Sequence, residues 1–391
     1  MELLNIKNYV KERKKLTTAA YEDGTMPMIR ITKPIRLIEL FAGYGSQAMA
    51  LERMGIKFEH YKVVEFDKYA VASYNAVHGT EFPTMDITKV HAADLNICDT
   101  DKFEYFMTYS FPCTDLSVAG KMKGMKKGSG TKSGLLWEVE RILTDINKSG
   151  GELPQVLFME NVPQVISDVN IKDFHAWQDF LQSLGYTNYL QVLNAKDYGV
   201  AQNRKRCFMF SFLGKYNYKF PAPIPLTKSM KDYLEDSVDE HYYINSEKAN
   251  KLIMNLIENG NVENKECIDL STVKTIKIKQ ATKEGYIKCK LGGVADLSYP
   301  MSKTRRGRVQ ENGNVSPTIT ATETGVCRIE SLYRIRKLTP RECGRLMDVS
   351  DENITKMEQV NSNSQLYKQF GNSIVVGVMV AMFKNLNIDQ R

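Results

Sequence analysis

Short apolar segments alternate with amphipathic segments along the first half of the chain. The apolar runs have the length and bounding turn residues of buried strands, and the longer stretches after them have the apolar spacing of helices. The predicted strands are residues 35–40, 61–67, 103–110 and 155–161, and the helices after the last two are residues 133–147 and 173–185. Strands and helices that alternate in this way are typical of a mostly parallel, doubly wound sheet. We therefore predict an α/β fold.

This alternation stops at a run of prolines among residues 221–225, which predicts a linker. Residues 226–325 are richer in Lys and Asn and have no crossover pattern, so we predict a second, smaller domain there. Helix signals return at Thr339, a good N-cap that is followed by Pro340 and, three residues after the cap, by Glu342. The predicted parts are an N-terminal extension (1–34), a main domain (35–225), the second domain (226–325) and a return to the main domain (326–391).

Length and composition describe an ordinary globular protein. The 391 residues allow two or three domains, and 42% hydrophobic with 25% charged residues is normal usage. We expect no membrane span, because no apolar run approaches the roughly 18 residues that a span needs. The charged N-terminus does not resemble a secretory signal, which predicts a cytoplasmic location. The seven cysteines are scattered without a CxxC pair, so we expect neither a disulfide framework nor a metal site.

The net charge of +7 is concentrated in two stretches. Residues 1–36 carry eight basic and four acidic side chains, and residues 114–134 carry five Lys and one Asp. Local excess of positive charge suggests a polyanionic partner. A solvated surface with a basic tail is the alternative interpretation.

A glycine-rich turn joins the first predicted strand to a helix. Gly43 and Gly45 lie in a G-x-G-x-x-A arrangement, and Glu65 ends the next strand 22 residues after Gly43. This pattern is typical of nucleotide binding, and it would suit NAD, FAD or S-adenosylmethionine equally, or a purely structural turn. Phe66 has the shape to stack on an adenine and Asp86 has the oxygen to accept from its amino group. A core aromatic and a helix cap are the alternatives for these two.

Two reactive groups occur where apolar strands end. Cys113 follows Pro112 just after a strand, at the edge where such sheets bind ligands. A packed cysteine and a nucleophilic thiolate are both consistent with this position. Glu160 ends the next strand, where a carboxylate costs free energy unless it is paired or functional, although Asn161 equally suits the start of a turn.

Gln202, Arg204 and Arg206 alternate along the chain. In a strand all three side chains project from one face, either as a charged surface or as a cluster directed into a site. The apolar alternation that follows favours the cluster.

Together and in this order, these segments resemble the DNA (cytosine-5)-methyltransferases. The resemblance covers about residues 35–220 and 333–385 and is carried by FAGYGS, VVEFDKYA, MDITKV, FPCTDLS, SGLLWE, MENV, QNRKR, RKLTPRECGRLM and QFGNSIVV. The sequence departs from the family at Thr114, where Gln is usual, and at Ser46 and Ser110, where Gly is usual or frequent. These departures affect the loops around the cofactor and the nucleophile and leave Cys113 in place.

The resemblance implies a Rossmann-like methyltransferase domain that transfers a methyl group from S-adenosylmethionine to carbon 5 of a flipped-out cytosine in a specific duplex DNA sequence. It implies a covalent adduct of Cys113, assisted by Glu160, Arg204 and Arg206. The implied cofactor residues are Phe41, Gly43, Gly45, Glu65, Phe66, Asp86, Ile87, Pro112, Leu135, Asn372 and Ser373. The implied DNA contacts are Ser117, Lys121, Lys123, Lys126, Lys127, Gln202, Arg305, Arg306 and Arg308.

The same resemblance makes residues 226–325 a target recognition domain and residues 120–134 a loop that closes over the flipped base. The expected partner is double-stranded DNA, bound by a monomer. The enzyme would be an orphan or phage methyltransferase, or would modify DNA beside a cognate restriction endonuclease. Two other functions stay open at this point: a tRNA cytosine methyltransferase, and a DNA-binding protein that kept the fold without the activity.

Overall fold

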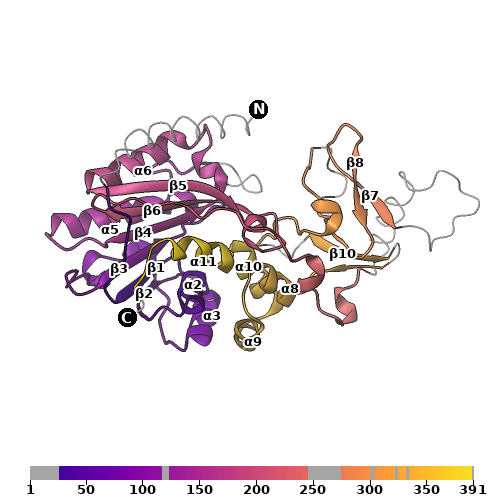
Figure 1. Cartoon of the computed structure of the whole chain (residues 1–391), viewed down its shortest axis with the longest axis horizontal. Helices are drawn as coiled ribbons and strands as arrows, with labels where there is room; N and C mark the ends of the chain where they lie inside the picture. Colours follow the sequence, from indigo (N-terminus) through magenta and orange to yellow (C-terminus); the bar gives the residue numbers. More distant parts are fainter. Residues whose placement is uncertain are drawn as a thin grey trace, which may run out of the picture. The chain divides into compact units, whose positions relative to one another are not determined.

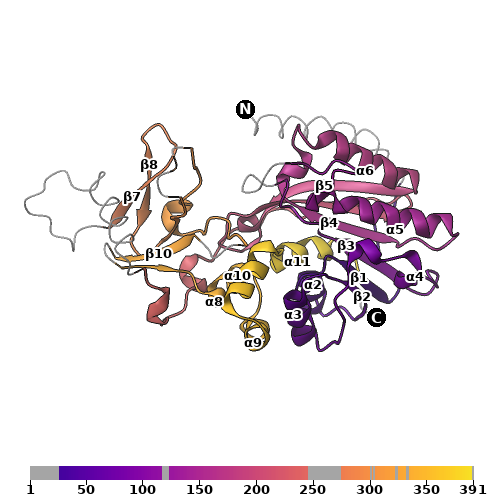
Figure 2. The ribbon, with the colours of Figure 1, turned by 180° about the vertical axis from the view of Figure 1, so that it is seen from behind.

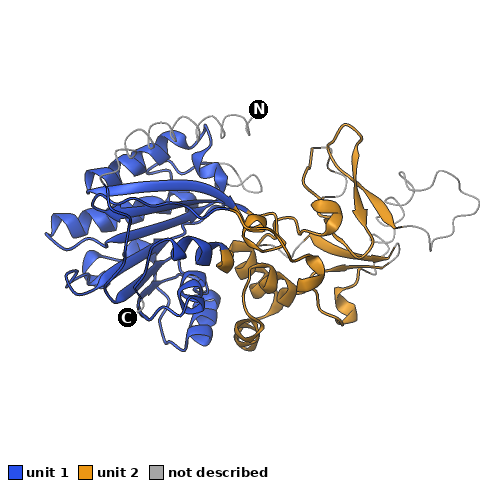
Figure 3. Ribbon diagram, in the orientation of Figure 1, with its two compact units in different colours: residues 1–193, 205–222, 378–391 blue, residues 194–204, 223–377 orange. Residues whose placement is uncertain are grey.

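The computed structural model of the protein describes residues 26–116, 123–244, 274–299, 302, 304–321, 325–331 and 334–389. The chain divides into two compact units (Figure 3). Unit 1 consists of residues 1–193, 205–222 and 378–391, and unit 2 of residues 194–204 and 223–377. The change of unit at residue 223 lies within the predicted proline linker. Residues 326–377, which the sequence assigns to the returning main domain, group with unit 2.

Unit 1 is built on a six-stranded sheet with the strand order β2-β1-β3-β4-β6-β5 (Figure 1). Its strands are β1 (Ile35–Leu40), β2 (Phe58–Val64), β3 (Glu104–Tyr109), β4 (Val156–Asn161), β5 (Tyr186–Asn194) and β6 (Lys205–Leu213). β1 pairs in parallel with β2 and β3, and β3 pairs in parallel with β4. The predicted α/β fold is confirmed. β6 adds an antiparallel strand beside β4, which the sequence pattern did not indicate.

Helices cover both faces of this sheet. They are α2 (Ser46–Arg53), α3 (Lys68–His78), α4 (Ala92–Leu95), α5 (Leu136–Lys148), α6 (Ile171–Ser183) and α11 (Val376–Lys384). Ile142 of α5 and Trp177 of α6 share one apolar cluster with Met107 of β3 (Figure 2). On the opposite face, Phe383 of α11 contacts Phe106 of β3, with ring centroids 5.3 Å apart. Neighbouring strand residues point to opposite faces, so Phe106 and Met107 pack against helices on opposite sides of the sheet.

One described segment, Asn363–Lys384, has the length and hydropathy of a membrane-crossing helix. It contains α10 (Asn363–Asn372) and α11, which are separate helices. In its most apolar window 67% is buried inside the protein. A buried helix of the core passes the same test of length and composition.

Unit 2 contains two small antiparallel sheets. The first consists of β7 (Thr275–Lys279) and β8 (Tyr286–Lys290), and the second of β9 (Val294–Asp296), β10 (Val326–Ser331) and β11 (Arg334–Lys337). A single apolar cluster joins them, with Ile278 and Cys289 from the first sheet and Ile329 and Ile335 from the second. The helices of the unit are α8 (Pro340–Leu346), α9 (Asp351–Val360) and α10.

The start of α8 is as predicted. Thr339 is the N-cap, its hydroxyl accepts from the Glu342 amide at 3.1 Å, and the Glu342 carboxylate accepts from the Thr339 amide at 2.9 Å. Pro340 occupies the first turn, where its missing amide hydrogen leaves no bond unmade. The same carboxylate also accepts from two guanidinium nitrogens of Arg336, at 2.6 and 2.8 Å, and both side chains are fully buried.

Candidate active site

The predicted site residues of unit 1 gather at the carboxyl ends of neighbouring parallel strands. This edge is where open α/β sheets bind ligands. β1 leads into Phe41, Gly43 and Gly45, β2 into Glu65 and Phe66, β3 into Pro112 and Cys113, and β4 ends with Glu160 and Asn161. Asn161 ties two of these ends together, because its side-chain amide donates to the Phe111 carbonyl at 2.9 Å.

The turn between β1 and α2 needs its glycines. Phe41, Gly43 and Gly45 all have positive φ values, of 58°, 57° and 80°. A Cβ atom on Gly45 would overlap the His78 ring and lie 2.7 Å from Tyr74 Cε2, whereas a Cβ on Gly43 meets nothing within 4 Å. Gly45 is therefore required both by its backbone conformation and by the side chains packed against it.

We expect Gly45→Ala to lower the free energy of unfolding of unit 1 by about 2–4 kcal/mol, from left-handed backbone strain plus the overlap with His78. Gly43→Ala is the matched control and should cost only about 1–2 kcal/mol, because its Cβ enters open space. Both tryptophans of the chain, Trp137 and Trp177, lie in unit 1, so urea unfolding followed by their fluorescence measures both variants. Equal losses of unfolding free energy in Gly45→Ala and Gly43→Ala would refute the steric explanation.

Glu65 closes the glycine turn from the next strand. Its carboxylate accepts from the Gly43 amide at 2.9 Å and from the Asp67 amide at 2.8 Å. Burial raises the pKa of Glu65, and these backbone hydrogen bonds oppose the rise. The Met85 amide donates to the Glu65 carbonyl at 2.8 Å, which places residues 85–87 beside the turn.

Phe66 and Asp86, for which the sequence leaves a structural alternative open, have different surroundings. Phe66 is 76% exposed, so it is not a core aromatic. Asp86 caps the short helix Ile87–Lys89, since its carboxylate accepts from the Thr88 amide at 3.0 Å. Hydrogen bonds from the Thr88 hydroxyl and amide lower the pKa of Asp86. Ile87 is buried in the main apolar cluster beneath the turn.

Hydrogen bonds also hold the loop that carries Cys113. The Ser133 hydroxyl donates to the Pro112 carbonyl at 2.7 Å, and the Asp115 carboxylate accepts from the Lys132 amide at 2.8 Å. These bonds fasten the loop to the short helix Lys132–Leu135, which contains the predicted cofactor residue Leu135. The sequence analysis did not single out Ser133 or Asp115 as supports, although both lie in the motifs that carry the resemblance.

Cys113 differs in exposure from most cysteines of the described residues. It is partly exposed, whereas Cys207, Cys289, Cys327 and Cys343 are buried and Cys98 is exposed. Burial raises the pKa of the Cys207 and Cys343 thiols well above the ordinary range and that of Cys289 to about 12. These three are therefore protonated at neutral pH and unsuited to nucleophilic attack.

Glu160 is paired. Its carboxylate lies 3.0 Å from Arg206 Nε, and the two side chains are only 8% and 14% exposed. Antiparallel pairing of β4 with β6 brings them together, because Glu160 lies opposite Phe208, two residues after Arg206. A carboxylate at the end of a buried strand is thus compensated by a guanidinium that retains further donors.

The prediction that Gln202, Arg204 and Arg206 share one face of a strand is wrong, because β6 begins only at Lys205. Gln202 and Arg204 belong to unit 2 and are buried there. Gln202 donates to the Leu346 carbonyl at 2.8 Å and accepts from the Ile319 amide at 3.2 Å. Gln202 is thus buried and bonded at both ends of its side-chain amide, and its predicted contact with DNA stays a prediction.

Arg204 binds main chain. Its guanidinium donates to the carbonyls of Ile319, Gly371 and Ser373, at 2.9, 2.8 and 2.6 Å. Such bonds fix the end of α10, where the predicted cofactor residues Asn372 and Ser373 lie. Within unit 2, Arg204 therefore holds the end of α10 in place, and its predicted contact with the pyrimidine stays a prediction.

The lysines of the predicted closing loop are only partly described. Ser117 and Lys121 lie outside the described residues, and Lys123 and Lys126 are exposed. Lys127 is exposed as well, but its ammonium lies 2.5 Å from the Glu140 carboxylate and 5.4 Å from the centre of the Trp137 ring. The Lys127 side chain therefore lies against α5.

The three predicted arginines of the recognition region also differ. Arg308 is buried, and its guanidinium donates to the carbonyls of Asp296, Ser298 and Tyr299. Burial lowers the pKa of Arg308. Arg305 pairs with the Asp296 carboxylate, with Nε at 2.9 Å, and Arg306 is exposed.

Comparison with known proteins identifies the family. The family described as "C-5 cytosine-specific DNA methylase" matches residues 35–387. The type II methyltransferase M2.ScrFI of Lactococcus lactis subsp. cremoris is 32% identical over 402 residues, covering 90% of this chain and 99% of that protein. The type II methyltransferase M.HhaI of Haemophilus parahaemolyticus is 33% identical over 360 residues, covering 90% and 94%.

Solved structures agree in fold. The Dnmt2 methyltransferase of S. pombe superimposes with a TM-score of 0.59 at 17% identity, covering 90% of this chain and 97% of that one. The methyltransferase EhMeth of Entamoeba histolytica has the same TM-score at 18% identity, with 90% and 98% covered. Together with the matched family and the relatives at above 30% identity, this establishes that the chain is an enzyme and belongs to the C-5 cytosine-specific DNA methylase family.

Proposed function

We propose that the chain methylates carbon 5 of a flipped-out cytosine within a specific sequence of duplex DNA, through a covalent adduct of Cys113. The observation that carries the proposal is the arrangement at the sheet edge. A partly exposed cysteine follows β3, and the ion pair of Glu160 with Arg206 lies at the end of the adjacent strand β4. A nucleophile and a proton-handling carboxylate on neighbouring strand ends are the two groups that this chemistry needs.

The Cys113 thiolate opens the reaction by adding to carbon 6 of the ring. The electron pair of the carbon 5–carbon 6 double bond moves through the ring toward the nitrogen beside the amino group, so that carbon 5 becomes nucleophilic. Carbon 5 would take the methyl group as the methyl–sulfur bond of the sulfonium breaks and its electron pair stays on that sulfur. Carbon 5 then loses its proton to a general base, and the electron pair of that C–H bond re-forms the carbon 5–carbon 6 double bond as the Cys113 sulfur leaves as a thiolate. Before these steps the target cytosine must leave the duplex, at a cost of a few kcal/mol for unstacking and unpairing.

Glu160 is the group that we assign to the ring nitrogen beside the amino group. By holding a hydrogen bond or a proton there, it stabilises the negative charge that the thiolate adds to the ring. Arg206 keeps this carboxylate in place through its Nε, 3.0 Å away, and its planar guanidinium has other N–H groups for the pyrimidine carbonyl.

The residues of the glycine turn fit S-adenosylmethionine. The left-handed backbone at Gly43, where a Cβ would meet nothing within 4 Å, leaves room for a ligand to approach, Glu65 sits at the second strand end, and Phe66 presents an exposed ring. We propose that Glu65 holds the ribose and Phe66 the adenine, with Phe41, Asp86, Ile87, Pro112, Leu135, Asn372 and Ser373 as further contacts. The cofactor, when bound, supplies an electrophilic methyl group on a sulfonium.

Exposed lysines next to the Cys113 loop support a phosphate contact. We expect Lys123→Gln combined with Lys126→Gln to reduce the slope of log K against log salt by about 0.9 for each lost contact. Lys127→Gln is the matched control and should change the slope less, because Glu140 already holds that ammonium. Fluorescence anisotropy of labelled duplex DNA over a salt series gives the slopes. An unchanged slope in the double variant would argue for a passive loop.

We propose double-stranded DNA as the partner, read by unit 2, with Arg305 and Arg306 among the contacts, and a monomer that acts in the bacterial cytoplasm. A restriction-modification, orphan or phage role is consistent with the relatives, which include type II and orphan methyltransferases. Incubation with labelled S-adenosylmethionine and either duplex DNA or tRNA tests the substrate. We expect label in DNA alone. Label only in tRNA would replace the proposed substrate, and label in neither would indicate a protein that binds without catalysis.

A further inference from the structure

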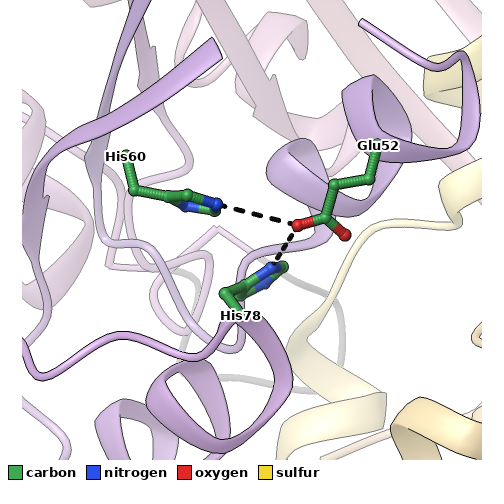
Figure 4. Close-up of side chains that lie close together, drawn as sticks. All are labelled: Glu52, His60 and His78. Atoms are coloured by element: carbon green, nitrogen blue, oxygen red, sulfur yellow. Dashed lines mark hydrogen bonds and ion pairs between the residues drawn. The ribbon is translucent and has the colours of Figure 1, made fainter. Parts of the chain in front are cut away.

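Three side chains from three separate elements of unit 1 converge beneath the glycine turn (Figure 4). Glu52 comes from α2, His60 from β2 and His78 from the end of α3. Glu52 Oε1 lies 2.7 Å from His78 Nδ1 and 3.7 Å from His60 Nε2, and the three possible ligand atoms all lie within 4.8 Å of one another. The function proposed above uses none of these groups.

The other ring nitrogen of His60 is held by a tyrosine. His60 Nδ1 lies 2.8 Å from the Tyr74 hydroxyl, and that hydroxyl donates to the Glu39 carboxylate at 2.6 Å. Because the hydroxyl has one hydrogen and gives it to Glu39, His60 Nδ1 must be the donor in its own bond. The lone pair of a neutral His60 is then on Nε2, which faces Glu52.

A backbone carbonyl fixes His78 in the same way. His78 Nε2 lies 3.2 Å from the Tyr44 carbonyl oxygen, which can only accept, so Nε2 carries the hydrogen. His78 Nδ1 and Glu52 Oε1 lie 2.7 Å apart, and both would then be acceptors unless a proton lies between them. A cation at this point would take the place of that proton.

We propose that Glu52, His60 and His78 bind a divalent transition-metal ion, with Zn²⁺ as the best fit. Two imidazoles and a carboxylate are a ligand set that zinc uses, with water in the fourth position of a tetrahedron. At bond lengths of about 2.0–2.1 Å the ligand atoms of such a site lie about 3.4 Å apart, so shifts of the order of 1 Å suffice. Glu52 is exposed, which leaves an entry path for the ion.

Bonds to the outer nitrogens strengthen this assignment. Metal-bound histidines generally donate their second ring N–H to a carboxylate, a backbone carbonyl or a similar acceptor, which sets the tautomer. Here the Tyr74–Glu39 pair does this for His60 and the Tyr44 carbonyl does it for His78. The His78 ring also packs where a Cβ on Gly45 would be, so a bound ion would brace the cofactor turn by linking α2, β2 and α3.

The test is binding of the metal alone to the full, untagged chain freed of metal with a chelator. We expect calorimetry with Zn²⁺ to give one site per chain, and Glu52→Gln and His78→Gln to weaken it by at least about tenfold. Glu52→Gln is the more decisive variant, because an exposed side chain is replaced by one of the same shape. Circular dichroism of each variant establishes that it is folded.

Two controls exclude other sites. His91→Gln removes a histidine outside the cluster, and Cys113→Ala removes the partly exposed thiol; both variants should bind Zn²⁺ like the wild type. Co²⁺ in place of Zn²⁺ should give the visible spectrum of a four-coordinate site without a thiolate charge-transfer band. Absence of saturable Zn²⁺ binding up to about 100 μM, or unchanged affinity in folded Glu52→Gln, would overturn the proposal.

Discussion

Cys113→Ala should lower the rate of methyl transfer by at least about 10⁴-fold and leave binding of S-adenosylmethionine intact. Without the sulfur no adduct forms at carbon 6, and carbon 5 does not become nucleophilic. The measurement is transfer of labelled methyl groups to duplex DNA, with calorimetry for the cofactor. Because only the small, partly exposed side chain of Cys113 is shortened at the margin of the main apolar cluster, we expect the fold to be unaffected.

Cys98→Ala provides the matched control for this variant. Cys98 is also exposed, but it lies on the chain before β3 and plays no part in the proposed chemistry. The control should retain full activity. Substantial turnover in Cys113→Ala would contradict the covalent mechanism, and loss of cofactor binding would mean that the loop, and not the nucleophile, had been damaged.

A large effect on stability is expected in unit 2. Glu342→Gln should lower its free energy of unfolding by about 3 kcal/mol, because the buried Arg336 guanidinium loses its fully buried counter-charge and keeps only the partly exposed Glu330. The carboxylate accepts four hydrogen bonds, two from Arg336 and one each from the amides of Glu235 and Thr339. An amide group has only one oxygen to offer them. Both tryptophans are in unit 1, so urea unfolding of unit 2 is followed by far-ultraviolet circular dichroism.

Glu358→Gln serves as the control for that measurement. Glu358 also pairs with an arginine of unit 2, Arg341, but its side chain is 32% exposed. Ion pairs that water can reach contribute about 0–1 kcal/mol. Equal losses in Glu342→Gln and Glu358→Gln would show that burial of the Arg336 pair does not have the energetic weight that we assign to it.

Much of the site's framework could be predicted from local sequence. The strand ends that carry Gly43, Glu65, Cys113 and Glu160 follow from apolar runs that stop at polar or glycine residues, and parallel strands bring such ends to one edge. The helix at Thr339 was predicted for the same kind of reason, because a capping box is complete within four residues.

Local sequence does not indicate the partners of side chains when those partners are distant in sequence. Arg204 donates to the carbonyls of Ile319, Gly371 and Ser373. Arg206, only two residues later, pairs with Glu160. Arg308 likewise looks like a surface arginine beside Arg306, but backbone carbonyls bury it. Alternation along the chain indicates which face a side chain takes only where a strand is present, and the start of β6 at Lys205 was not signalled.

The proposed metal site shows the same limit of local patterns. Unpaired cysteines predict no metal site, and Glu52, His60 and His78 are too widely spaced in the sequence to form a motif. They meet because β2 lies next to β1 and because α2 and α3 both follow strands of that pair. Such a cluster is visible only once the chain has been folded.

The covalent adduct of Cys113 with cytosine is the central claim, and a trapping experiment tests it most directly. Duplex DNA from a genomic template, synthesised with 5-fluorocytosine in place of cytosine, offers a wide range of recognition sequences. After methyl transfer, fluorine at carbon 5 leaves no proton to remove, so the sulfur cannot leave carbon 6. With S-adenosylmethionine present, we predict a complex that survives denaturation and whose DNA-linked peptide contains Cys113. No stable complex, or a linkage through another residue, would contradict the account.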